Sequence, residues 1–384
     1  MCSFFIHINA GYSEKSTRGN TFFNVSPDDI TVLLHEKPDN VYFKKKDRLN
    51  PGIVYTTLTQ YSKSGKPHQN ASGGDFDLFS TWSICNKHLQ NSLIGARLEQ
   101  RHRFSSIAPR YFNTMIHTVV PTTKGFNQFD AALTELWWEN NLTQETLIGL
   151  RVGKLDFSTL INSYAFNSQK QFFLNDIFTG APSIAQPNNA LGLVAGLRNS
   201  ANYYAAISVA DTNGDKTTSG FNTFFHYGQF FKSIELGYRD KLHNTRADNY
   251  HLLLWQSDPS AVHKLPSDSG IALLLQKNIN QALLPFISLS VSHGHATLLK
   301  RMINTGIGIF NPFNDNEGEL LGLGAGYVTP SDTKKQPEIV LETFYRMTFH
   351  SLIEITPDIQ LIRLNRHNTE HWVTVGSLRF RAIV

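Results

Sequence analysis

Several stretches of the chain carry charged residues that are two or four positions apart. Arg97, Glu99 and Arg101 follow this spacing, and so do Glu235 and Arg239. In an extended strand alternate side chains point to the same face, so each set would project in one direction. Guanidinium and carboxylate groups arranged in this way can donate and accept hydrogen bonds with a polar solute. The chemistry that they suggest is reversible binding of a polar molecule.

The residue patterns of common catalytic and metal sites do not occur in the sequence. There is no Walker lysine loop, nucleophile elbow or zincin helix motif, and Cys2 and Cys85 cannot form a Cys-x-x-Cys pair. The alternating glycines of 322–326 suit a crowded strand face better than a dinucleotide fingerprint, which needs a following helix. His293 and His295 have no third ligand nearby in the sequence and are expected in a solvated loop. We therefore expect no enzyme activity, no cofactor and no bound metal.

The composition excludes several classes of protein. Of the 384 residues 41% are hydrophobic and only 17% are charged, against a typical charged share of ~25%. The 27 Phe, 13 Tyr and 5 Trp argue against disorder. The 35 basic and 31 acidic residues are spread along the chain, so we expect no nucleic-acid partner. No stretch has the ~18–20 consecutive apolar residues that a membrane-spanning helix needs.

Apolar and polar residues alternate with period two, in blocks of about ten residues, from residue 52 to the end. In 338–348, for example, Ile339 and Leu341 fall on one face, and Glu338 and Glu342 fall on the other. Each predicted strand thus has an apolar face and a polar face. A soluble β-sandwich shows the same alternation, so the pattern by itself leaves a sandwich and a membrane barrel open.

The lengths of the connections favour the barrel. Long intervals at 62–75, 102–129 and 157–189 alternate with short ones at 86–90 and 140–145, as extracellular loops and periplasmic turns do in transmembrane β-barrels. We predict an all-β, antiparallel transmembrane barrel of about sixteen strands. The predicted strands lie near 52–61, 76–85, 91–101, 130–139, 146–156, 190–198, 202–210, 232–239, 249–257, 269–278, 283–292, 304–311, 319–328, 338–349, 353–363 and 371–382.

The segment 221–231 also has the composition of a strand, which would make seventeen. We assign it to a loop, because single-chain bacterial barrels have an even number of strands and because an extra strand would break the alternation of long and short connections.

The connection 157–189 is too long for a turn and is rich in aromatic residues. It carries Tyr164, Phe166, Phe172, Phe173 and Phe178. Such a loop would be costly to leave in water, so we expect it to fold into the barrel mouth; the alternative is packing over the rim or on a neighbouring subunit. The connection 102–129 is the second candidate. A sixteen-strand barrel leaves a water-filled lumen, which makes the polar faces its lining.

Several strings of the sequence resemble the OprB family of carbohydrate-selective porins. The most specific are Glu-Leu-Trp-Trp-Glu at 135–139 and Arg-Val-Gly-Lys-Leu-Asp at 151–156. Further strings that fit the family, in the same order, lie at 162–164, 171–175, 182–189, 236–238, 249–252, 275–277, 321–324 and 356–360. The similarity covers most of residues 45–382.

The resemblance implies an outer-membrane porin of a Gram-negative cell, through which small sugars, monosaccharides above all, diffuse down their gradient. Its partners would be the sugar and the surrounding outer-membrane lipid, and the sequence leaves open whether the barrels form homotrimers. A general-diffusion or anion-preferring pore is the alternative, since inward arginines also attract anions. Residues 1–40 match nothing in the family. Residues 1–45 are predicted to be a leader, disordered or periplasmic, with a plug as the alternative, before a single barrel domain at 46–384.

We predict a pore lining and constriction made of residues from the polar faces and from the long loop. These are Arg97, Glu99, Arg101, Glu135, Trp137, Arg151, Glu235, Arg239, Glu342 and Arg346 on the strands, with Asn175, Gln186 and Asn188 from the matched loop strings. An aromatic ring such as that of Trp137 could offer its face to the C–H groups of a sugar. The alternative is that these charges pair with one another and brace the barrel wall.

Overall fold

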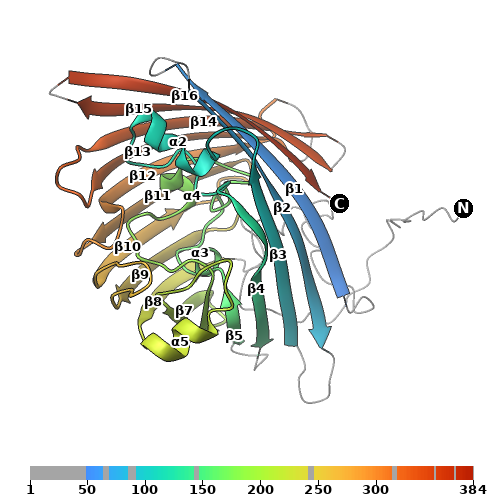
Figure 1. Cartoon of the computed structure of the whole chain (residues 1–384). Helices are drawn as coiled ribbons and strands as arrows, with labels where there is room; N and C mark the ends of the chain where they lie inside the picture. Colours follow the sequence, from blue (N-terminus) through green and yellow to red (C-terminus); the bar gives the residue numbers. More distant parts are fainter. Residues whose placement is uncertain are drawn as a thin grey trace, which may run out of the picture.

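The chain folds into a closed antiparallel β-barrel in which each strand pairs with the next and β1 pairs with β16 (Figure 1). The structure is a computed structural model, and it describes residues 49–63, 69–84, 92–141, 147–240, 246–313, 318–349, 352–366 and 369–383. The predicted boundary between residues 45 and 46 lies outside these residues, so the division into leader and barrel stays a prediction. Within the described residues, no helix is long and apolar enough to cross a membrane.

The sixteen predicted strands are confirmed. They are β1 Leu49–Ser62, β2 Gln69–Ile84, β3 Ser92–Arg103, β4 Phe129–Asn141, β5 Leu147–Leu155, β6 Ala190–Arg198, β7 Tyr203–Asp211, β8 Phe230–Arg239, β9 Asn249–Ser257, β10 Asp268–Gln276, β11 Leu283–Ser292, β12 Leu299–Phe310, β13 Leu320–Pro330, β14 Glu338–Phe349, β15 Ile353–Arg366 and β16 Thr369–Ile383.

The segment 221–231 does not form a strand of its own. Helix α5, Phe221–Tyr227, occupies most of it, and its last two residues begin β8. Gly220 and Gly228 flank the helix with φ angles of 80° and 58°, in the left-handed region where glycine is favoured. The helix therefore ends at Gly228, before β8 begins, and the number of strands stays even.

Each strand has one face toward the lumen and one toward the outside, as the alternation predicts. On β9 the side chains of Leu253 and Trp255 are buried within the barrel, whereas Leu254 between them is 48% exposed on the outer wall. An outer wall of exposed leucine and isoleucine side chains suits a lipid surrounding.

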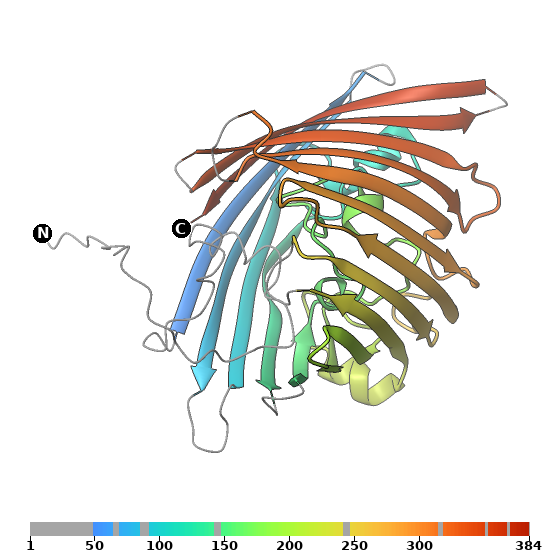
Figure 2. The same ribbon diagram turned by 180° about the vertical axis from the view of Figure 1, so that it is seen from behind.

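The two longest connections fold into the barrel, as predicted for 157–189 and 102–129. Figures 1 and 2 show their short helices within the ring of strands: α2 (Phe112–Ile116) in the first, and α3 (Phe157–Leu160) and α4 (Asp176–Thr179) in the second. In the second connection the five predicted aromatic residues are buried. The rings of Tyr164, Phe166 and Phe173 pack on Phe286 of β11, and the centre of the Phe173 ring is also 4.9 Å from that of Phe344 of β14.

A charge on the outer wall tests this arrangement. Leu254→Arg should lower the free energy of unfolding by about 2–4 kcal/mol, the cost of an arginine near the bilayer midplane, whereas Gln256→Arg, two residues nearer the rim on the same face of β9, should cost about 0–1 kcal/mol. Urea titration in lipid vesicles, followed by tryptophan fluorescence, measures both. Equal effects at the two positions would contradict a lipid-facing wall.

Candidate functional site

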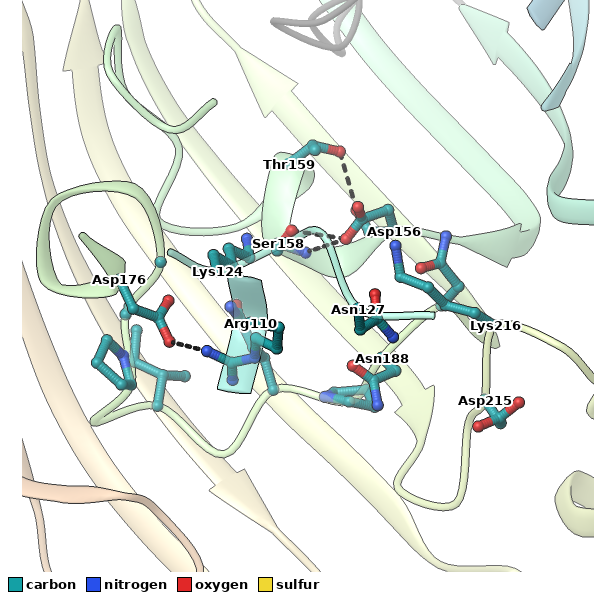
Figure 3. Close-up of a pocket in the computed structure, with 18 of the residues that line it drawn as sticks. Arg110, Lys124, Asn127, Asp156, Ser158, Thr159, Asp176, Asn188, Asp215 and Lys216 are labelled. Atoms are coloured by element: carbon teal, nitrogen blue, oxygen red, sulfur yellow. Dashed lines mark hydrogen bonds and ion pairs between the residues drawn. The ribbon is translucent and has the colours of Figure 1, made fainter. Parts of the chain in front are cut away.

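A cavity of about 730 Å³ lies at the rim where the long connections emerge. Strands β3 and β4 form part of its wall, and the connections 104–128, 156–189 and 212–229 supply most of the rest. Figure 3 shows charged and amide side chains from these loops facing one another across it. Of the predicted residues, those that line the cavity are Arg97, Glu99, Arg101, Glu135, Gln186 and Asn188.

The wall of this cavity is a network of ion pairs. The Nε of Arg97 lies 3.0 Å from Glu135, and the Nε of Arg101 lies 2.7 Å from Asp75. Glu99 accepts from Arg101. The alternative that these charges pair with one another therefore holds for Arg97, Glu99, Arg101 and Glu135, which nonetheless remain at the cavity surface.

Lys170, at the tip of the inward loop 156–189, completes the network. Its ammonium group lies 3.1 Å from Asp75, contacts Asp77 and is 3.7 Å from Glu99. The lysine is 1% exposed, so these carboxylates, and not water, stabilise its charge. The oxygens of the three carboxylates come within 4.8 Å of one another, a spacing that a metal ion could use, but Lys170, Arg101 and Lys216 already pair with them. We interpret the cluster as the anchor of the loop.

A third connection, 212–229, also covers the cavity. The sequence assigned 221–231 to a loop but did not indicate that this connection folds inward. The ammonium group of Lys154 donates to the backbone carbonyls of Leu133 at 2.9 Å, Lys216 at 2.8 Å and Thr218 at 2.5 Å. These bonds hold residues 216–218 inward, so that the side chain of Lys216 reaches Glu99 at 3.3 Å.

The contacts that sequence reasoning missed are between distant parts of the chain. Lys170 and Lys216 lie in loops, where no periodicity indicates the direction of a side chain. Asp75 and Asp77 alternate with Phe76 and Leu78, a signal that could have placed both carboxylates on the lumen face, but the predicted strand began at 76.

Asp156 lies at the end of β5, where the inward loop begins. Burial favours its neutral form, but the charges of Lys124 and Lys216 and hydrogen bonds from Ser158 outweigh it and lower the pKa of this carboxyl from its ordinary value. The Ser158 backbone N–H donates to Asp156 at 3.0 Å (Figure 3). Asp156 therefore presents a fixed negative charge to the cavity at neutral pH.

Trp137 and Arg151 lie on the lumen side away from this cavity. The guanidinium carbon of Arg151 is 4.0 Å from the centroid of the Trp137 ring, and its Nε donates to Glu139 at 3.0 Å. A Cβ added at Gly95 would meet the same indole at 2.1 Å. The ring is thus packed between strand backbone and a guanidinium group, an arrangement that limits its use as a platform for a sugar.

Glu235, Glu342 and Asn175 hold the inward loop to the wall. Glu235 accepts from the backbone N–H of Asn162 at 2.6 Å. Glu342 accepts from the backbone N–H of Asn175 at 3.1 Å and from that of Leu174. The Asn175 side chain caps α4 and donates to Gln360 at 2.9 Å.

Arg239 and Arg346 lie at the opposite rim, where the connections are short. Arg346 donates to the carbonyl of Gly318 at 2.9 Å, and its Nε is 4.0 Å from Glu354. Arg239 is buried at the end of β8, and its backbone N–H donates to the carbonyl of Asn202 at 3.0 Å. The structure thus places the predicted residues in four groups: the cavity lining, the loop anchors, the contact between Trp137 and Arg151, and the far rim.

A closed sixteen-strand barrel with a polar lumen narrowed by inward loops is the architecture of a porin, a class of channel. The chain belongs to the carbohydrate-selective porins of the OprB family, whose model matches residues 96–381.

Known structures and a curated relative agree with this membership. OprB of Pseudomonas putida has the same fold: its high-pH structure superimposes with a TM-score of 0.71 and 12% identity, covering 88% of this chain and 94% of that one. Its low-pH structure gives a TM-score of 0.57, again at 12% identity, with 88% and 92% covered. Porin AaxA of Chlamydia pneumoniae is 23% identical over 277 residues, and the match spans 62% of this chain and 62% of that relative.

Removing the loop anchor should affect both stability and selectivity. Lys170→Met leaves Asp75, Asp77 and Glu99 without one of their cations, so the free energy of unfolding should fall by about 3–5 kcal/mol and the pore should become more cation-selective. The matched control is Lys124→Met, which lines the same cavity but acts on Asp156. Urea titration and reversal potentials in a salt gradient measure the two effects. A selectivity unchanged from wild type would show that the cluster does not face the permeating solutes.

Proposed function

We propose that this porin lets small carbohydrates, chiefly monosaccharides, diffuse passively across the outer membrane of a Gram-negative cell. The observation that carries the proposal is the charge balance of the cavity. Its described lining includes six Arg or Lys residues, Arg97, Arg101, Arg110, Lys124, Lys170 and Lys216, and six Asp or Glu residues, Glu99, Glu135, Asp156, Asp176, Asp215 and Asp258.

Opposite charges line the cavity in equal numbers, and Asp75 and Asp77 add two carboxylates beside Arg101 and Lys170, so the network has no excess of positive charge. Arg110 lies 3.1 Å from Asp176, and Lys216 and Arg97 are paired with Glu99 and Glu135. A pore that concentrates anions needs an uncompensated excess of basic groups, because selectivity by charge rings depends on one sign. The balance therefore favours a neutral polar solute over the alternative of an anion-preferring pore.

The same pairs can serve as a surface of fixed donors and acceptors. A guanidinium group that contacts one carboxylate still has N–H groups to offer, and a carboxylate has further lone pairs. A sugar in the cavity would exchange hydrogen bonds with water for bonds with these groups as it advances. Such binding must be weak, because a channel has to release what it admits.

In this proposal the predicted site residues have different roles. Arg97, Glu99, Arg101 and Glu135 form the narrow, ion-paired wall that the sugar passes. Glu235, Glu342 and Asn175 act through the loop that they hold, whereas Arg151 packs on Trp137 outside the cavity lining. The partners are the sugar inside and outer-membrane lipid outside. A homotrimeric assembly, which the sequence left open, is tested by the mass of the complex in detergent.

The test is conduction through single pores in planar bilayers. Wild-type protein should show weak ion selectivity and a current that glucose reduces. Glu135→Gln removes the partner 3.0 Å from Arg97, so the reversal potential should shift toward anion preference while the barrel still assembles. Strong anion selectivity of the wild type, with no response to glucose, would support the anion-preferring alternative.

A further inference from the structure

Tyr111 offers the cavity an aromatic ring that the ion-pair network does not cover. It ends the 3-10 helix η1, Pro109–Tyr111, in the inward connection between β3 and β4, lines the cavity and is 51% exposed. The other Phe or Tyr in the described lining, Phe129, lies beside Arg101, whose guanidinium carbon is 5.4 Å from its centroid.

The backbone that carries Tyr111 is fixed on both sides. Pro109 and Phe112 are buried, and the Tyr111 N–H donates to the carbonyl of Ala108 at 2.9 Å. Arg110 donates to Asp176 at 3.1 Å, the contact drawn in Figure 3, and to the carbonyl of Thr123 at 3.2 Å. An exposed ring on such a fixed segment costs little further order when a ligand binds to it.

Amide side chains accompany this ring in the cavity. Gln128, Gln186 and Asn188 belong to the lining, and Gln128 and Asn188 are exposed. Within the described part of the chain, no hydrogen bond or ion pair occupies the side chains of these three residues. An amide offers both a donor pair and an acceptor, which matches a sugar hydroxyl in either role.

We propose that Tyr111, with Gln186 and Asn188, forms a subsite for a neutral pyranose ring in front of the ion-paired wall. The C–H face of a pyranose is flat and apolar and can pack on an aromatic ring, while its hydroxyl groups point outward toward the amides. The cavity of about 730 Å³ lies within the range of small-molecule sites. This inference rests on the proposed function and names the class of solute, a pyranose ring, that the cavity binds.

A cyclic sugar and its open-chain counterpart distinguish stacking from hydrogen bonding. Glucose and sorbitol carry similar hydroxyl groups, but only glucose has a rigid ring face. Wild-type pores should therefore be blocked by glucose at a concentration at least about threefold lower than by sorbitol.

Three variants test the role of the ring in the same single-channel assay. Tyr111→Ala should raise the half-blocking concentration of glucose by roughly threefold to tenfold, leave that of sorbitol unchanged and so remove the preference. Tyr111→Phe keeps the ring and should retain it. Tyr227→Ala is the matched control, because Tyr227 is an exposed tyrosine of α5 outside the cavity lining. Migration on gels with and without heating reports whether each variant assembles.

The outcomes separate this inference from the proposed function. Glucose block in the wild type with an unchanged half-blocking concentration in Tyr111→Ala would overturn the subsite and leave the sugar porin intact. An equal loss for glucose and sorbitol would show that Tyr111 acts on the shape of the entrance and not by stacking, which also overturns it. A wild-type pore that neither sugar blocks and that admits no glucose into liposomes would overturn both.

Discussion

The structure depends on the need to satisfy every backbone hydrogen-bonding group where no water is available. Lipid offers no partner to an open strand edge, so the sheet closes through the pairing of β1 with β16. The inward loops face the same need inside the barrel, because packing against the wall excludes water from their amides. Glu235, Glu338 and Glu342 meet it by accepting backbone N–H groups, for example that of Val119 at 2.6 Å from Glu338. Carboxylates that appeared from the sequence to line a pore thus also fix the loops that shape it.

Most of the wall could be predicted from the sequence, since a strand with lipid on one side and water or loops on the other must alternate. The alternation does not tell which inward positions meet water. On β14 the lumen face reads Glu338, Val340, Glu342 and Phe344, and the apolar members pack on the inward loop. The loop residues that pack on these apolar side chains are far away in the sequence, so no local pattern predicts the contacts.

The glycines of 322–326 show what a local sequence pattern can predict and what it cannot. Their alternation predicted a crowded lumen face, and the structure confirms it: a Cβ at Gly324 would meet the Phe178 ring at 2.9 Å, and one at Gly326 would meet Ile177 at 2.4 Å. The sequence indicated that space was needed there. It could not indicate that helix α4 of the inward loop would fill it, because that depends on where a 34-residue connection folds within the lumen.

The two sides of the lumen differ in what they present to the inward loop. Along β10 to β16 the wall and the loop share an apolar cluster that includes Phe286, Phe344 and the loop aromatics. Along β2 and β3 the same loop meets the wall through Lys170 and its carboxylates. Buried apolar contacts exclude water, whereas an ion-paired surface keeps it, and the cavity lies beside the charged residues of β3 and β4. The aromatic residues of the loop and the charges of β3 are therefore parts of one arrangement: the first fill part of the lumen, and the second line the cavity that remains open.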